Sequence, residues 1–168
     1  CLSRGLGDVY KRQIFHDGNL LPGDAFRCGE AGHMTLIPDG KPCYCGKTGC
    51  VDAYCSARLL SDLSGGRLED FFLGLQQNNP DYRSVWDTYL KHLAVVINNL
   101  HILLDYDIVL GGYVGSFLTP WLDTIRYLVA ERNTFEDDGS FIKLCTYQIG
   151  AAAYGAAMDV MEEFLRTV

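Results

Sequence analysis

"GHMTLIPDGKPCYCGKTGC" runs from Gly32 to Cys50 and places one histidine and three cysteines in a single short segment. Cys43 and Cys45 are one residue apart, and Cys50 follows after four intervening residues. Zinc favours four tetrahedral ligands, and thiolates combined with an imidazole form a common set. Free cysteines also occur as inert core residues, but a close cysteine pair in a polar, glycine-rich loop does not resemble a core segment. We therefore predict a zinc site whose ligands are His33, Cys43, Cys45 and Cys50.

Two carboxylates flank this segment. Glu30 lies three residues before His33, and Asp52 lies two residues after Cys50. Four protein ligands would close the coordination sphere, so the metal is expected to hold the loop in shape rather than to activate water. If the chain folds back at residues 38–40, both carboxylates come to lie beside the imidazole on one rigid wall. Such a wall suits the neighbouring hydroxyl groups of a sugar, which offer paired donors and acceptors.

Two alternatives stay open around this segment. Cys28 is the best substitute ligand if His33 does not bind the metal. The two carboxylates could instead belong to a structural ion cluster, in which Arg27 or Arg58 pairs with both of them.

The composition is that of an ordinary globular chain: 168 residues, 48% hydrophobic and 21% charged, with a formal net charge of -7. A chain this acidic is a poor stand-alone nucleic-acid binder, because phosphate contacts need clustered Lys and Arg. DNA binding is therefore expected only through an N-terminal domain that lies outside this sequence. No apolar run approaches the ~20 residues of a membrane helix, so no membrane partner is expected. Seven cysteines without a signal-peptide pattern indicate a reducing, cytoplasmic location.

The first thirteen residues have a separate interpretation. The chain begins with Cys1, and "DVYKRQ" at Asp8–Gln13 resembles the translation of a sequencing adapter. The alternative is a genuine polar surface segment. We expect residues 1–13 to be an artefact and natural sequence to begin at Ile14, so that the chain is a fragment without its N-terminal part.

Short strands and helices alternate in the remaining sequence. Asp17-Gly18-Asn19 predicts a hairpin turn, since tight hairpin turns require positive φ. Strands are expected at 33–37, at 107–112 as a run buried on both faces, and at 141–145. Helices are expected at 51–63, at 68–76, from Asn79-Pro80 onwards, from Thr119-Pro120 to Glu131, and from Gly150 to the end.

The helix that begins at Asn79-Pro80 should be the longest. Its apolar residues recur at four- and three-residue steps and predict one buried stripe: Val85, Tyr89, Leu93, Val96, Leu100 and Leu103. Asn98 and Asn99 lie off that stripe. The order of elements predicts an α/β half-domain with a mixed sheet, and Cys145 is expected in its core.

Several motifs together resemble the ROK family (repressor, open reading frame, kinase) of bacterial sugar kinases and sugar-responsive repressors. They are "GEAGH" at Gly29–His33, "CYCGKTGCVD" at Cys43–Asp52, "IVLGG" at Ile108–Gly112 and "GAAAYGAA" at Gly150–Ala157. The resemblance implies the C-terminal lobe of an actin-like, ribonuclease-H-like ATPase fold, here residues 14–168. It also implies a hexose or N-acetylhexosamine ligand in a cleft between two lobes, and a homo-oligomer when the protein is full length.

The resemblance assigns roles to individual residues. Glu30 and His33 match sugar-binding positions, and His33 also matches the zinc-binding histidine. Asp52 matches a sugar-contacting position at which the family usually has Glu, and its shorter side chain moves the carboxylate back by about one C–C bond. Gly111 and Gly112 match the glycines on the nucleotide side.

Two motifs of the family's kinases have no counterpart here: the N-terminal phosphate-binding Asp-Gly-Gly motif and the Asn-Asp pair that supplies the general base. Phosphoryl transfer depends on positioning and charge stabilisation from both lobes, so no catalysis is expected of the chain and no catalytic residue is assigned. Tyr113 stands where kinases of the family commonly have a third small residue, which favours the regulator branch. The alternative is the C-terminal half of a sugar kinase, which would use ATP and Mg²⁺.

Overall fold

The computed structural model describes residues 14–16, 19–21, 23–25 and 27–147, together with positions 150, 157, 161, 164, 165 and 167. Residues 1–13, the Asp17-Gly18 turn and most of the helix expected from Gly150 onwards lie outside the described residues. The described elements are β1 (Phe15–His16), β2 (Asn19–Leu20), η1 (Ala31–His33), α1 (Asp52–Cys55), α2 (Ala57–Ser61), η2 (Asp62–Ser64), α3 (Leu68–Gln76), α4 (Pro80–Leu104), β3 (Ile108–Leu110), α5 (Gly112–Gly115), η3 (Thr119–Trp121), α6 (Leu122–Ala130) and β4 (Ile142–Leu144).

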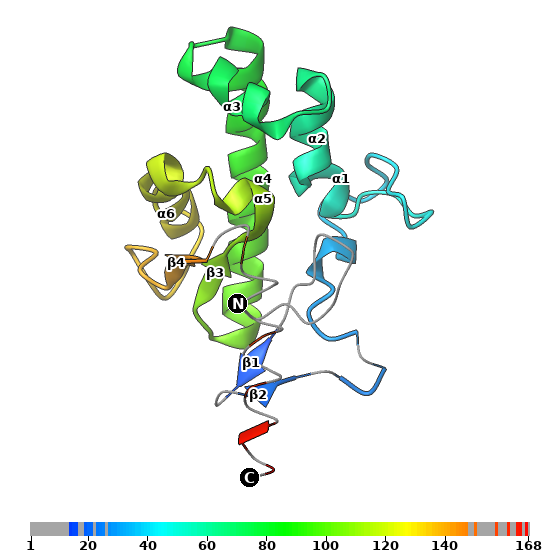
Figure 1. Cartoon of the computed structure of the whole chain (residues 1–168), viewed down its shortest axis with the longest axis vertical. Helices are drawn as coiled ribbons and strands as arrows, with labels where there is room; N and C mark the ends of the chain where they lie inside the picture. The colour runs from blue at the N-terminus through cyan, green and yellow to red at the C-terminus, as the bar shows by residue number, and fades with distance from the viewer. Residues whose placement is uncertain are drawn as a thin grey trace.

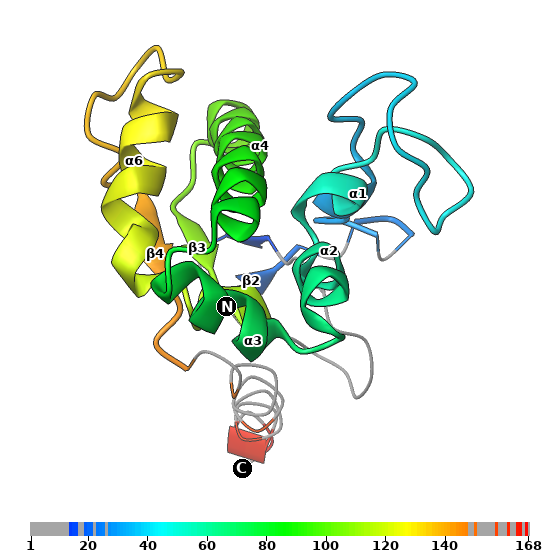
Figure 2. The ribbon, with the colours of Figure 1, turned by 90° about the horizontal axis from the view of Figure 1, so that it is seen from above.

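Helix α4 is the central element of the fold. In Figures 1 and 2, α6 and the β3–β4 pair lie on one side of it, and α1, α2 and the cysteine-containing loop lie on the other. The side chain of Asn79 caps its first turn by accepting hydrogen bonds from the backbone of Asp81 and Tyr82. Pro80 follows in the first turn, and Asp105 ends the helix in the left-handed conformation, with φ of 54°. The expected helix start is therefore confirmed.

The buried surface of α4 differs from the single stripe predicted. Leu103 is 76% exposed, whereas Asn98 is 8% exposed. The helix packs against α1, α3 and α6, so it buries more than one face. One continuous buried row instead follows four- and three-residue steps: Trp86, Leu90, Ala94, Ile97 and His101. A stripe derived from apolar spacing alone could not anticipate neighbours on several sides.

An aromatic cluster fills the core between α3, α4 and the start of α6. Trp86 is fully buried, and its ring contacts those of Phe72 and Tyr89, each with a centroid separation of 5.1 Å. Trp121 completes the cluster at 5.6 Å from Trp86. Helix α3, which spans the predicted 68–76, contributes four buried side chains to this region: Leu68, Phe71, Phe72 and Leu75.

The strands predicted at 107–112 and 141–145 are confirmed as β3 and β4, which form a parallel pair. The hairpin predicted around Asp17 is confirmed as the antiparallel pair β1–β2. Among the described residues these are two separate two-stranded sheets and not one mixed sheet. Burial of β3 on both faces is wrong for the described part, because Val109 is 42% exposed while Ile108 packs against the core.

Two further local predictions need correction. The helix expected at 51–63 is broken at Ser56, which is extended (φ -91°, ψ 153°) and caps α2 by accepting a hydrogen bond from the Leu59 backbone. The strand expected at 33–37 is absent from this fully described segment: residues 31–33 form a 3-10 turn, and Thr35 makes an isolated bridge to Cys50. The helix expected after Thr119 is confirmed as η3 followed by α6.

Candidate metal centre

The loop between η1 and α1 doubles back on itself, as the metal prediction requires. Two isolated antiparallel bridges hold it, Thr35 with Cys50 and Pro42 with Thr48. The Gly49 backbone N–H donates to the carbonyl of Lys41 at 2.8 Å, and the carbonyl of Gly49 accepts from Leu36 at 2.8 Å. These bonds bring the residues before Pro38 beside the residues after Lys47.

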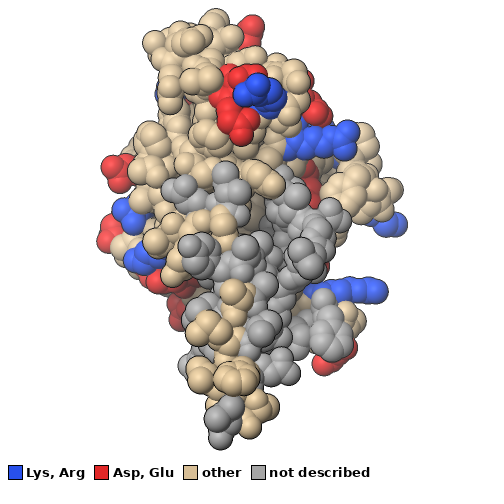
Figure 3. Space-filling view, viewed as in Figure 1, with Lys and Arg blue, Asp and Glu red and all other residues tan. Residues whose placement is uncertain are grey.

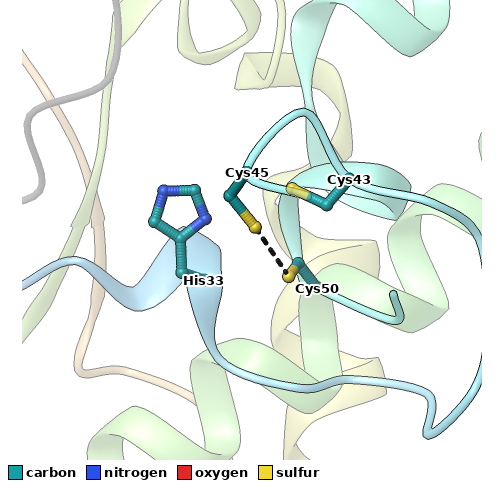
Figure 4. Close-up of side chains that lie close together, drawn as sticks. All are labelled: His33, Cys43, Cys45 and Cys50. Carbon is teal, nitrogen blue, oxygen red and sulfur yellow. Dashed lines mark hydrogen bonds between the residues drawn. The ribbon is translucent and has the colours of Figure 1, made fainter. Parts of the chain in front are cut away.

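The four predicted ligands meet in this loop. One candidate ligand atom from each of His33, Cys43, Cys45 and Cys50 lies within 4.8 Å of all the others. Figure 4 shows the three thiols grouped together, with one ring nitrogen of His33 facing Cys45. The sulfur atoms of Cys45 and Cys50 are 3.7 Å apart. A zinc tetrahedron with Zn–S bonds of about 2.3 Å has edges of about 3.8 Å, so this spacing fits two zinc thiolates.

The thiols of Cys45 and Cys50 have pKa values shifted in opposite directions. Burial, followed by hydrogen bonds with Cys45 and Cys43, raises the pKa of the Cys50 thiol to about 11. Hydrogen bonding to the Lys47 backbone, followed by that to Cys43, lowers the pKa of Cys45. A cluster of this kind gives up its remaining protons when a divalent cation binds, because thiolates are the form that ligates. Three sulfurs and one imidazole nitrogen supply the full set that a structural zinc ion needs.

The loop is anchored to the helical part of the molecule through Tyr54 on α1. The buried hydroxyl of Tyr54 accepts a hydrogen bond from the Lys41 backbone at 2.6 Å. A side chain at Gly40 would overlap this hydroxyl, so a glycine is required there. The ring of His92 on α4 contacts the Tyr54 ring edge-on at 5.1 Å. Burial, and then the charge of Lys41, lower the pKa of His92.

Tyr44 is a site residue that the sequence reasoning missed. Its hydroxyl lies 3.3 Å from Nε2 of His33 and donates to Oδ2 of Asp52 at 3.3 Å. Desolvation of the hydroxyl, then the nearby charges of Asp52, Cys43 and Glu30, raise the pKa of Tyr44. The available signal was its position between two ligand cysteines, which confines its side chain to the metal loop.

The flanking carboxylates lie around this tyrosine. Glu30 is exposed and precedes η1, so the same short turn carries Glu30 and His33. Asp52 is the first residue of α1. Arg58 pairs with Asp62 at 3.5 Å, and no ion pair between described residues joins Arg27 to Glu30. The described contacts thus give no support to the arginine-clamped ion cluster.

The two predicted nucleotide-side glycines lie elsewhere, at the end of β3 (Figure 1). Gly111 is extended, and Gly112 has φ of 74° at the start of α5, a conformation that favours glycine. Tyr113 follows and is 47% exposed. It borders an open cavity of about 340 Å³, whose other lining residues come from α2, from the link before α3 and from α3, and include Arg58 and Arg67. The structure therefore does not bring these glycines into the metal cluster.

The other described cysteines lie outside the cluster. Cys145 follows β4 and is 7% exposed, as expected of a core residue. Cys28 is free and half-buried and does not belong to the four-residue group.

A family model described as "ROK family" matches residues 2–162. The chain belongs to the ROK family. An N-acetylmannosamine kinase from Escherichia coli O7:K1 is 29% identical over 159 residues, which are 90% of this chain and 53% of that protein. The chain thus spans about half the length of the curated relatives that it matches.

Two solved structures of the family have the same fold. A ROK family protein from Streptococcus pneumoniae in complex with sucrose is 21% identical, with a TM-score of 0.72 over 92% of this chain and 55% of that chain. A ROK family transcriptional regulator, described as a homologue of the E. coli MLC protein, is 24% identical. It has a TM-score of 0.66 over 87% of this chain and 41% of that chain.

These similarities confirm the fold class, an α/β lobe that corresponds to part of a ROK protein. The cluster of His33, Cys43, Cys45 and Cys50 is consistent with the zinc-binding motif of the family. In the part of the chain that the structure describes, no helix is long and apolar enough to cross a membrane.

Proposed function

We propose that this chain is the sugar-binding part of a ROK-family, sugar-responsive transcriptional regulator. Its ligand would be a hexose or an N-acetylhexosamine bound by Glu30, His33 and Asp52. The observation that supports this proposal is the cluster at His33: a metal ion there would fix the orientation of the imidazole, and the Tyr44 hydroxyl links its Nε2 to Asp52. Family relatives that bind sugars include the sucrose complex from S. pneumoniae.

The zinc ion would supply a rigid cross-link and no chemistry of its own. One nitrogen of His33 faces the thiols, so the other remains outside the metal cluster and can donate a hydrogen bond. Glu30 and Asp52 would accept hydrogen bonds from sugar hydroxyls. Fixed donors and acceptors lose little conformational entropy when a ligand binds, which favours affinity.

The regulator assignment rests on two departures from the kinase pattern. Tyr113 follows Gly112 where a small residue is common in the kinases, and Asp52 stands where Glu is usual. In the described part of the face seen in Figure 3, acidic and basic side chains are interspersed, and Lys and Arg do not gather into one patch. DNA contact would then fall to a separate N-terminal domain, and the full-length protein would be a cytoplasmic homo-oligomer.

A sugar kinase is the second candidate, and the curated relatives favour it. The E. coli relative that covers 90% of this chain is an N-acetylmannosamine kinase. In that case Gly111 and Gly112 would border the nucleotide, and Tyr113 could stack on an adenine ring. ATP and Mg²⁺ would be required, together with a catalytic base supplied by the other lobe.

Calorimetry on the full-length natural protein that carries residues 14–168 tests the sugar site. We expect saturable binding of at least one of D-glucose, D-mannose, N-acetyl-D-glucosamine and N-acetyl-D-mannosamine. Glu30→Gln should weaken it by about 1.5–3 kcal/mol, the contribution of a hydrogen bond to a charged group. Zinc content should not change. Glu131→Gln is the matched control, since Glu131 is an exposed carboxylate that accepts from Tyr127 on α6.

Two assays on the same protein distinguish a regulator from a kinase. A regulator should release its operator DNA when sugar is added and should not form sugar phosphate from ATP. Sugar-dependent consumption of ATP would contradict the regulator assignment and support the kinase. Unchanged sugar affinity in Glu30→Gln would contradict the proposed site in either branch.

A further inference from the structure

Tyr44 occupies the space between two residues of the proposed sugar site. Its hydroxyl lies 3.3 Å from Nε2 of His33 and 3.3 Å from Oδ2 of Asp52. The rings of Tyr44 and His33 meet edge-on, with centroids 5.3 Å apart and an interplanar angle of 64°. One phenol oxygen therefore bridges the imidazole and the carboxylate.

Metal binding at His33 determines the direction of both hydrogen bonds. The nitrogen that faces the thiols would be the metal ligand, since Nε2 is the atom next to the tyrosine hydroxyl. A neutral, metal-bound imidazole carries its proton on the other nitrogen, here Nε2. Nε2–H then donates to the Tyr44 oxygen, and the Tyr44 hydroxyl donates to Asp52. Every donor in this chain of groups has an acceptor.

A sugar hydroxyl between the same two residues would make the same pair of hydrogen bonds. It would accept from Nε2–H of His33 and donate to the carboxylate of Asp52. We infer that the Tyr44 hydroxyl is a displaceable occupant of a hydroxyl-binding position between His33 and Asp52, and that a bound sugar takes its place. This inference rests on the proposed function and adds a residue that sets the affinity of the same site.

The placement of Tyr44 allows such a displacement. The side chain is 80% exposed, so it can rotate into solvent without opening the core. Both of its hydrogen bonds, at 3.3 Å, are longer than the normal range. The backbone around it is held separately, because Cys43 N–H donates to Lys47 at 2.8 Å and Gly46 N–H donates to Cys43 at 3.0 Å. Only side-chain torsions need to change.

Removing the hydroxyl should therefore increase sugar affinity. Tyr44→Phe keeps the ring beside His33 but leaves the hydrogen-bonding position open to the ligand. We expect the four sugars named above, or those of them that bind, to bind about threefold to tenfold more tightly, equivalent to about 0.6–1.4 kcal/mol. Tyr127→Phe is the matched control, because the Tyr127 hydroxyl is exposed and donates to a carboxylate, that of Glu131, at 2.7 Å.

The test combines three measurements on the zinc-loaded, full-length natural protein: calorimetric affinity, zinc content and the aromatic ¹H–¹³C signals of Tyr44. The expected result is tighter binding in Tyr44→Phe, wild-type affinity in Tyr127→Phe, equal zinc content, and a shift of the Tyr44 signals when sugar is added.

Three results would overturn the inference. If sugars bind the wild type but Tyr44→Phe binds them equally or less well, the displaceable role is wrong while the proposed function stands. Loss of zinc in Tyr44→Phe would make Tyr44 a support of the metal site instead. If none of the sugars binds any variant, the proposed function fails and the role of Tyr44 fails with it.

Discussion

A side chain at position 49 would overlap the carbonyl oxygen of Ile37, and the backbone there has φ of 79°. Gly46 has a similar φ of 84°, but a side chain at that position would meet no atom within 4 Å. Substitution of either glycine would therefore strain the backbone, but only substitution of Gly49 would also cause a steric overlap.

Gly49→Ala should disrupt the loop far more than Gly46→Ala. Left-handed backbone costs a non-glycine residue about 1–2 kcal/mol, which applies to both positions. Gly49→Ala adds the overlap with Ile37 and so should also lower zinc affinity. Chelator competition and thermal unfolding of the two variants measure the difference. Equal zinc affinity in both variants would contradict the described loop geometry.

Cys45→Ser should abolish stoichiometric zinc binding, because three ligands are left and the site loses the thiol that lies 3.7 Å from that of Cys50. Elemental analysis of protein purified under reducing conditions measures the zinc content, expected at about one ion per chain in the wild type.

Cys28→Ser is the matched control for that loss, since Cys28 is a free cysteine outside the four-residue group. It should keep its zinc. Zinc lost in Cys28→Ser as well as in Cys45→Ser would favour the alternative ligand set considered from the sequence, in which Cys28 replaces His33.

At the scale of elements, local signals in the sequence predicted a helix start well where a capping residue is followed directly by a proline. Asn79-Pro80 marks the start of α4, and α3 fills the span predicted for it, whereas the end of α4 at the left-handed Asp105 was not predicted. At Ser56 the prediction failed. Its side chain caps α2 and so divides the segment 51–63, whose apolar spacing predicted a single helix. Segment 33–37 pairs with the chain after Lys47 instead of forming a strand, and such a long-range contact is not encoded in the local pattern.

The contact between α4 and the metal loop should be sensitive to acid through His92. Burial and the charge of Lys41 lower its pKa in the folded chain, so the unfolded chain, with a pKa near 6.5, binds the proton first as pH falls. The stabilisation from neutral His92 is therefore present above about pH 6.5 and is lost as pH falls through the lower folded value.

Urea unfolding of the wild type and of His92→Gln between about pH 7.5 and 5.5 measures this effect. The free energy of unfolding should fall more over that range in the wild type than in the variant. Any titration at the metal cluster should change the free energy of unfolding of both proteins equally. Parallel profiles would show that His92 does not contribute.

At the scale of the whole molecule, the metal site could be predicted from the sequence but its surroundings could not. Ligand spacing identifies His33 and the three cysteines because a metal constrains residue types directly. Tyr44 has no such signature, since its role depends on where the folded loop directs its ring. The exposed face of β3 at Val109 likewise depends on which neighbours cover the sheet, and the spacing of apolar residues does not contain that information.

The central claim is that Glu30, His33 and Asp52, held in position by zinc, bind a sugar. The most direct test compares the sugar affinity of the protein with and without zinc. Zinc would be removed from the full-length natural protein by a chelator, and circular dichroism would verify that its helices remain. Calorimetry with the sugars that bind the zinc-loaded protein should show at least a tenfold loss of affinity after removal, equivalent to about 1.4 kcal/mol, with recovery when zinc is restored. Equal sugar affinity in the zinc-free, folded protein would contradict the account.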